Sequence, residues 1–183
     1  MTTILDNYEY VREHIRMVPD FPQKGILFLD ITTAVKDSKS MNIMMDFLYE
    51  KFKNQNVDYV AGVESRGFIF ASALAYKLNL GFIPIRKPNK LPAKTIKESY
   101  SLEYGTDTIE MHEDALKPGD RVVVIDDLLA TGGTAVAACN LVKRAGADVV
   151  AAAFIIELDP LKGRQKLEEN GYSVVSMLNY DLD

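Results

Sequence analysis

The sequence is short of cysteine and of positive charge and has no long apolar run, and each shortage excludes a class of protein. The one cysteine, Cys139, rules out an internal disulfide and favours a reducing compartment. The net charge of −5 does not provide the excess of positive charge that nucleic-acid binding favours. No apolar run approaches the roughly 18 residues of a membrane span, and residues 1–18 contain no apolar segment typical of a secretory signal. We therefore expect a cytoplasmic protein that binds neither nucleic acid nor membrane.

Histidine is also scarce. His14 and His112 have no cysteine or histidine at metal-ligand spacing, so no zinc site is expected. What the chain does have is an ordinary globular composition, with 183 residues of which 48% are hydrophobic and 26% charged. This length suits one domain spanning 1–183.

Helical and extended patterns alternate along the chain. Helices are predicted over 5–17, 41–52, 67–78, 134–145 and 161–169, and strands over 57–62, 81–85, 106–112, 121–125, 148–156 and 172–177. The polar, proline-punctuated stretch 87–99 is predicted to be an exposed, mobile loop. Most of the strands are too apolar to have a wet face, so we predict an α/β fold with a mainly parallel central sheet flanked by helices.

The segment VVVIDDLLATGGT, residues 122–134, indicates a binding site. A buried-strand run is followed by Asp126 and Asp127, and Gly132 and Gly133 precede a predicted helix. Ligands of open α/β sheets bind at the carboxyl ends of the strands, and glycines let the backbone approach a ligand closely. The segment matches neither a Walker A loop nor a G-x-G-x-x-G fingerprint, because no lysine follows its glycines and their spacing differs.

The ligand that suits this segment is a ribose 5-phosphate. The N–H groups of residues 130–135 lie at a helix start, where an anion is favoured, and the hydroxyls of Thr131 and Thr134 add donors. Asp126 and Asp127 supply acceptors for two vicinal sugar hydroxyls. The alternative is that the two acids cap a turn and the glycines merely close a corner.

The segment GVESRGFIF, residues 62–70, follows another predicted strand and opens a helix. Arg66 and the N–H groups of Ser65 to Gly67 suit a second anion, such as pyrophosphate. An ordinary surface pair of Glu64 and Arg66 is the alternative.

A basic cluster lies in PIRKPNKLP, residues 84–92, where Arg86, Lys87 and Lys90 surround a turn. In an acidic protein this cluster suggests an anion site, although a solvated charged face is the other interpretation.

Residues 122–134 closely resemble the phosphoribosyl diphosphate (PRPP) motif of type I phosphoribosyltransferases. With 62–70, FPQKGILFLD (21–30) and YSLEYG (100–105), the chain resembles adenine phosphoribosyltransferases from about Tyr8 to the last strand. The resemblance implies a type I fold with a small N-terminal hood over about 1–34 and a flexible lid loop over about 94–105. It also implies transfer of the phosphoribosyl group of PRPP to adenine, with Mg²⁺, in a homodimer.

The resemblance assigns roles to individual positions. Asp126 and Asp127 would hold the ribose hydroxyls and 130–134 the 5-phosphate, while Glu103 would manage a proton on the purine and Tyr104 would close the lid. The remaining contacts are implied for pyrophosphate by Ser65, Arg66, Arg86, Lys87 and Lys90, and for the base by Ile26, Leu27 and Phe28.

Three points stay open at this level. No dedicated protein ligand cluster for Mg²⁺ is implied, so PRPP would hold the ion with help from Asp126 and Asp127. Leu29 stands where many relatives carry a charged residue, which leaves a side-chain contact near the base in doubt. Another purine phosphoribosyltransferase and a PRPP-sensing regulator are the competing functions.

Overall fold

The computed structural model describes residues 3–101 and 105–181, and its centre is a five-stranded parallel sheet. The strand order is β4 (Gly81–Ile85), β3 (Tyr59–Val63), β7 (Arg121–Leu129), β8 (Asp148–Leu158) and β9 (Val174–Tyr180). Every neighbouring pair in this sheet is parallel. The prediction of an α/β fold with a mainly parallel sheet is confirmed.

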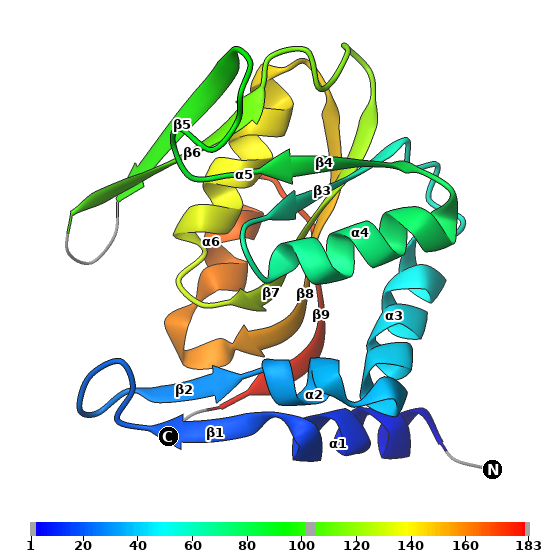
Figure 1. Cartoon of the computed structure of the whole chain (residues 1–183), viewed down its shortest axis with the longest axis vertical. Coiled ribbons are helices and arrows are strands. Elements are labelled where there is room, and N and C mark those ends of the chain that lie inside the picture. Colours follow the sequence, from blue (N-terminus) through cyan, green and yellow to red (C-terminus); the bar gives the residue numbers. More distant parts are fainter. Residues whose placement is uncertain (1–2, 102–104, 182–183) are drawn as a thin grey trace.

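Helices cover both faces of the sheet (Figure 1). The first group is α2 (Thr32–Lys36), α3 (Ser38–Phe52) and α4 (Gly67–Leu78), and the second is α5 (Gly133–Arg144) with α6 (Gly163–Glu169). Side chains of a strand point alternately to opposite faces. Accordingly Val123 and Ile125 pack into the core on the α3 and α4 side, whereas Val122 and Val124 pack against α5.

The N-terminal segment forms a separate layer at the bottom of Figure 1. Helix α1 (Ile4–His14) begins with a capping box between Thr3 and Asp6 and leads into β1 (Arg16–Pro19), which pairs antiparallel with β2 (Leu27–Asp30). The sequence predicts one helix through residue 17, which is wrong for its end, since β1 begins at Arg16. This layer contains most of the residues predicted to form the hood, and we call it the hood; its role over the base stays a prediction.

A second hairpin, β5 (Thr95–Ser101) with β6 (Thr106–His112), projects at the upper left of Figure 1. The prediction of a loop over 87–99 is therefore wrong for residues 95–99, which belong to a strand. That residues 94–105 act as a lid stays a prediction. Ile96 and Tyr100 pack against the α5-side core while Lys97 and Ser99 are exposed. This alternation is a strand pattern that the polar composition conceals.

Two strands are longer than the sequence predicts. β7 continues to Leu129 and β8 to Leu158, where a short 3-10 turn, η1 (Asp159–Leu161), precedes α6. The C-terminal strand begins at Val174 and ends at Tyr180. In the described part of the chain no helix combines the length and apolar character that a bilayer crossing requires.

Candidate active site

Loops that follow three parallel strands meet around one cavity of about 290 Å³. Because the strands are parallel, their carboxyl ends lie at the same edge of the sheet, where α/β proteins bind ligands. The lining residues come from the ends of β3 and β4, from β7 and from the start of α5; they are Val63, Glu64, Ser65, Arg66, Lys87, Asp126, Asp127 and Thr134.

A smaller cavity of about 90 Å³ adjoins it, lined by Asp126 and by residues 128–135. Asp126 and Thr134 line both cavities, so the two spaces are neighbours. Gly132 is the residue before α5 and has φ 78°, a left-handed conformation that favours glycine. A helix start leaves its first N–H groups without intrahelical partners, so they suit an anion in the smaller cavity. We call residues 130–134 the phosphate cradle.

The two predicted sugar-binding acids lie inside β7 rather than beyond its end, and Asp126 pairs in register with Phe154. The Oδ1 atom of Asp126 accepts a hydrogen bond from the backbone N–H of Asp127 at 2.8 Å. Burial, and then the neighbouring charge of Asp127, hold the pKa of Asp126 well above its usual value. Two carboxylates this close favour ligands that donate hydrogen bonds to them or cations that neutralise them.

Arg66 compensates part of this negative charge. Its Nε donates to Oδ2 of Asp127, whose side chain is only 7% exposed. Burial alone would lower the pKa of the guanidinium, but the charges of Asp127, Asp126 and Asp30 raise it. Arg66 therefore stays cationic at the junction between the acids and the hood.

The hood supplies an aromatic surface at this junction. The guanidinium carbon of Arg66 lies 5.6 Å from the centre of the Phe28 ring, and Phe21 meets that ring edge-on at 5.1 Å. Of the residues predicted to enclose the base, Leu27 and Phe28 are half-buried in β2, and Ile26 is 39% exposed in the loop before it. The structure thus brings the predicted base-binding segment to the edge of the cavity.

The uncertain position, Leu29, is buried in the core at 3% exposure and packs with the α1 to α4 cluster. It alternates with Phe28 along β2, so its side chain belongs to the core between hood and sheet. The absence of a charge there leaves the Phe28 side of the hood unaffected.

The predicted pyrophosphate cations are each engaged differently. Lys87 lines the larger cavity and contacts Asp107 and the hydroxyl of Tyr100, the latter at 3.2 Å. Arg86 donates from Nε to Glu64 at 2.6 Å, and Lys90 is exposed with its carbonyl accepting from Arg86 at 3.1 Å. Ser65 and Arg66 line the cavity, and the Glu64–Ser65 peptide bond is cis.

Several acids that hold these cations, or the turn that carries them, escape prediction from the sequence. Asp107 on β6 holds Lys87, and Glu64 pairs with Arg86. Glu110, only 2% exposed, accepts from the backbone N–H of Asn89 at 2.9 Å. Asp107 and Glu110 lie three residues apart in TDTIEMH, and nothing in that pattern identifies their basic partners.

Burial of Lys87 alone would lower its pKa, whereas its hydrogen bonds to Asp107 and Tyr100 and their charges raise it above the usual value.

Two predicted residues, Glu103 and Tyr104, lie outside the described part of the chain. Among the residues that are described, no group of three or more histidine, cysteine or acidic side chains forms a metal site.

Residues 32–181 match the family model described as a phosphoribosyl transferase domain. Together with the parallel sheet, the phosphate cradle and the paired acids, this match defines a type I phosphoribosyltransferase.

Similar proteins of known sequence and structure identify the family within this class. An adenine phosphoribosyltransferase of Koribacter versatilis is 53% identical over 174 residues, covering 95% of this chain and 94% of the relative. That of Solibacter usitatus is 56% identical over 167 residues, covering 91% and 95%. A crystal structure of the Thermoanaerobacter pseudethanolicus adenine phosphoribosyltransferase has a TM-score of 0.91 at 47% identity, covering 94% of this chain and 99% of the other.

The structure of the Saccharomyces cerevisiae adenine phosphoribosyltransferase, complexed with an imino-altritol bisphosphate and adenine, has a TM-score of 0.88 at 37% identity and covers 95% and 99% of the two chains. The chain belongs to the adenine phosphoribosyltransferase family.

Proposed function

We propose that this chain transfers the 5-phosphoribosyl group of PRPP to N9 of adenine, giving AMP and pyrophosphate, as expected of an enzyme of purine salvage. The observation that carries the proposal is the phosphate cradle directly beside Asp126 and Asp127, with Asp126 lining both cavities. A sugar phosphate needs an anion site and hydroxyl acceptors at neighbouring positions, and this site offers both.

The ribose 5-phosphate half of PRPP occupies the cradle and the two acids. Backbone N–H groups of Ala130, Thr131, Gly132, Gly133 and Thr134 hold the phosphate. Asp126 and Asp127 accept hydrogen bonds from the ribose hydroxyls, each charge-assisted bond contributing about 1.5–3 kcal/mol. Their negative charge also stabilises the cationic character that the anomeric carbon gains as its bond to pyrophosphate breaks.

The pyrophosphate half lies on the other side, against Ser65, Arg66 and Lys87, with Arg86 and Lys90 behind them. Negative charge accumulates on the leaving group as the C1–O bond breaks, and fixed cations stabilise it. Arg66 has a further part, because it links Asp127 to the hood through Phe28. Lys90 lines neither cavity, and in this proposal it reaches pyrophosphate from a neighbouring subunit.

Adenine stacks on Phe28 between Ile26 and Leu27, where main-chain groups read its edge. Glu103 holds the proton exchanged at the imidazole ring of the purine, and Tyr104 closes the lid formed by 94–105. Water would otherwise hydrolyse the activated sugar, so closure protects the reaction.

Magnesium enters with PRPP. The donor set fits this, because Asp126 and Asp127 offer two carboxylates but no third acidic or histidine ligand joins them among the described residues. A hard cation that retains waters and substrate oxygens suits such an incomplete set. When bound, Mg²⁺ neutralises pyrophosphate charge.

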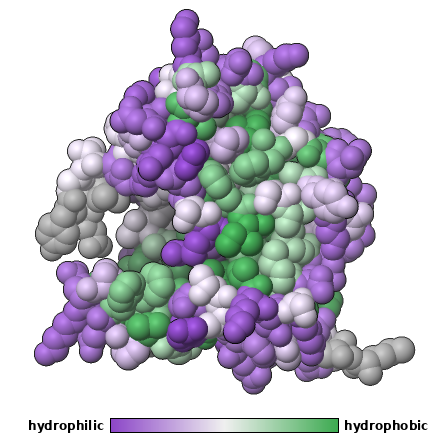
Figure 2. Space-filling model, in the orientation of Figure 1, coloured by the Kyte–Doolittle hydropathy of each residue, from purple (hydrophilic) through white to green (hydrophobic). Residues whose placement is uncertain are grey.

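The working unit is a homodimer in the cytoplasm. Five of the large apolar side chains that the structure exposes belong to the hood or its approach: Ile4, Leu5, Met17, Phe21 and Ile26. Figure 2 also shows hydrophobic residues gathered in the middle of one face, over α4. Such surface suits contact with a second copy, and the one buried thiol, Cys139, suits a reducing compartment.

The test is a transfer assay with PRPP and Mg²⁺ against adenine, guanine, hypoxanthine and xanthine. We expect AMP from adenine, with the other three bases at least about 100-fold slower, because hydrogen-bonding sites discriminate strongly against mismatched groups. Preference for another base would replace adenine but retain the PRPP site. Binding of PRPP without transfer to any base would support the regulator instead.

A further inference from the structure

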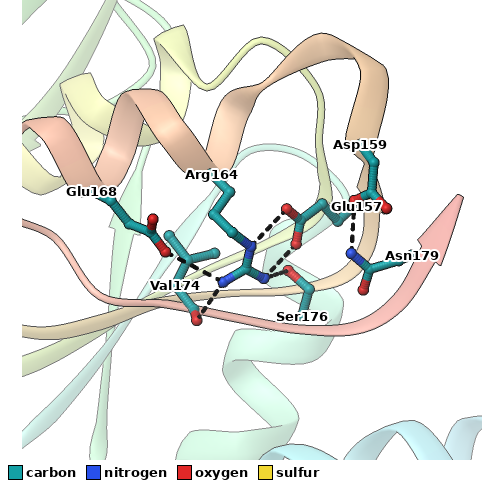
Figure 3. A network of polar contacts seen from close by, with 7 residues as sticks. All are labelled: Glu157, Asp159, Arg164, Glu168, Val174, Ser176 and Asn179. Atoms are coloured by element: carbon teal, nitrogen blue, oxygen red, sulfur yellow. Dashed lines mark hydrogen bonds and ion pairs between the residues drawn. The ribbon is translucent and has the colours of Figure 1, made fainter. Parts of the chain in front are cut away.

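Behind the phosphate cradle, α6 is fixed to the sheet by one arginine (Figure 3). Arg164 makes a two-pronged contact with Glu157, Nε to Oε1 at 2.9 Å and Nη2 to Oε2 at 2.6 Å. It also donates to the Val174 carbonyl at 3.1 Å and to Ser176 Oγ at 3.4 Å, and lies 3.6 Å from Glu168. With its donors engaged in this way, the guanidinium is not free to bind a substrate anion.

Glu157 is one of the few buried acids of the described chain, with its side chain only 4% exposed, against 37% for Arg164. A buried carboxylate requires a partner that satisfies both of its oxygens, and the arginine fork provides this geometry. A second bond, from Asn179 to Asp159 at 2.7 Å, fixes the turn before α6 to β9 (Figure 3). The start of α6 is thereby held to both β8 and β9.

The residue before Arg164 contacts the cradle. A Cβ on Gly163 would overlap the carbonyl oxygen of Ala130 and would come within 2.8 Å of Leu129. Conversely, a Cβ on Gly132 would lie 2.8 Å from the Gly163 carbonyl oxygen. The backbones of the cradle and of the α6 start are therefore in direct contact, with no side chain between them.

Glu157, the other residue of the ion pair, also lies beside the cradle. Glu157 of β8 pairs in register with Leu129 of β7, the residue immediately before the cradle. Two residues that contact or adjoin the cradle are therefore positioned by the ion pair. Leu129 is paired with Glu157 in the sheet, and Gly163 directly precedes Arg164 in α6. Neither charged side chain is among the residues that line the two cavities.

We propose that the Glu157–Arg164 pair is a positioning device for the phosphate cradle, setting the direction of its N–H groups toward the 5-phosphate of PRPP without touching the substrate. This inference rests on the proposed role of the cradle. Because the pair lies behind one half of the site only, its loss should weaken binding of the phosphorylated sugar and leave binding of pyrophosphate intact. A pair that only stabilised the fold would weaken both ligands together.

The test uses Arg164→Met and the double variant Glu157→Met/Arg164→Met in the full chain. Replacing a buried ion pair by apolar residues of similar volume often leaves stability unchanged, so the double variant keeps the fold while removing the fork. For both variants we expect the Kd of ribose 5-phosphate, measured by calorimetry, to rise about tenfold, as for a small misplacement of binding groups. The Kd of pyrophosphate should stay within about twofold of wild type on the same argument.

Steady-state kinetics provide a second readout that a purely structural role would not separate. KM for PRPP should rise while KM for adenine stays constant, and Arg164→Lys, which keeps the charge but not the fork, should lie between wild type and Arg164→Met. The matched control is Asp46→Asn/Lys77→Met, which removes an ion pair between α3 and α4. Both ligands should bind this control as they bind wild type.

Unchanged ribose 5-phosphate binding in the double variant would overturn the inference, and so would equal weakening of both ligands. Gly132→Val separates this from failure of the proposed function. If that variant loses ribose 5-phosphate while the Arg164 variants keep it, the cradle assignment holds and only the positioning role falls. If it binds normally, both fall together.

Discussion

The two proposed anion sites of this molecule are built on different physical principles. The phosphate cradle presents backbone N–H groups, contains no basic side chain and takes its shape from Gly132 and from contact with Gly163. The opposite side presents Arg66, Lys87 and Arg86, and each of them is already paired with an acid, namely Asp127, Asp107 and Glu64 respectively.

The difference determines how each site responds to change. A site made of backbone depends on conformation, so substitutions that alter shape should destroy it and changes of side-chain charge should not. A site made of paired cations depends on competition, because an incoming anion must share or displace the carboxylates. The cradle therefore suits the part of the substrate that stays bound throughout, and the paired cations suit the part that leaves.

The largest effect is expected for Gly132→Val. A side chain there would adopt an unfavourable left-handed conformation at about 1–3 kcal/mol, and its Cβ would lie 2.8 Å from the Gly163 carbonyl. We expect PRPP binding to weaken at least about 100-fold by calorimetry, which corresponds to about 2.7 kcal/mol.

Gly119→Val is its matched control, because Gly119 also has positive φ but nothing within 4 Å of its Cβ position. It should bind PRPP normally despite a similar conformational penalty. Equal loss of PRPP binding in both variants would show that general destabilisation, and not the shape of the cradle, is responsible.

Arg66→Met should have the next largest effect. It removes a cation from the leaving-group side and leaves the buried Asp127 without its partner. We expect kcat to fall about 100-fold in the transfer assay, the scale for loss of one stabilising group. The control is Arg121→Met. Arg121 begins β7, the strand that carries Asp127 near its other end, and donates to the carbonyls of Gln55 and Asn56, so this variant should keep its turnover. A retained kcat in Arg66→Met would assign stabilisation of the leaving group elsewhere.

Substitutions of Lys87 and of Asp107 should change pyrophosphate binding by a smaller factor and in opposite directions. Lys87→Met should weaken pyrophosphate binding about tenfold by loss of one charge-assisted contact, whereas Asp107→Asn should free Lys87 and strengthen binding about threefold. Product-inhibition constants for pyrophosphate measure both. If the two variants changed binding in the same direction, the ion pair would have a structural role and not a competing one.

The smallest effect concerns Asp126 and pH. Burial and the charge of Asp127 raise the pKa of Asp126 above its ordinary 3.8. Because the folded pKa exceeds the unfolded one, the stabilising contribution of the protonated form is complete below the unfolded pKa and is lost as pH rises through the folded value. Asp126→Asn should lack this loss and unfold in urea with about 1 kcal/mol more stability at neutral pH. If the free energies of unfolding of wild type and Asp126→Asn changed in parallel as the pH rises above 3.8, the raised pKa of Asp126 would be contradicted.

The cradle was open to prediction from sequence because its chemistry is local. Two acids, two glycines and a helix start lie within one short segment, and the backbone conformations that glycine favours are a property of the residue itself. The same holds for the parallel sheet, whose strands are continuous apolar runs. Fold class and the position of the site therefore follow from patterns that span a few residues.

The ion pairs were not open to prediction because their members are distant in sequence. Lys87 and Asp107 meet because β6 lies beside the segment that follows β4, where Arg86 pairs antiparallel with Glu110. The polar residues of β5, the hairpin partner of β6, make that strand look like a loop in the sequence. Glu157 and Arg164 are close in sequence, but their role depends on Gly163 contacting a cradle more than 30 residues earlier, at Ala130. Which acid holds which cation is a property of tertiary packing.

A crystal structure with PRPP and Mg²⁺ bound tests the central claim most directly. We expect the 5-phosphate within hydrogen-bonding distance of the N–H groups of residues 130–134, with the ribose hydroxyls against Asp126 and Asp127. A phosphate bound elsewhere, or an empty cradle with PRPP held only by the basic side chains, would contradict it.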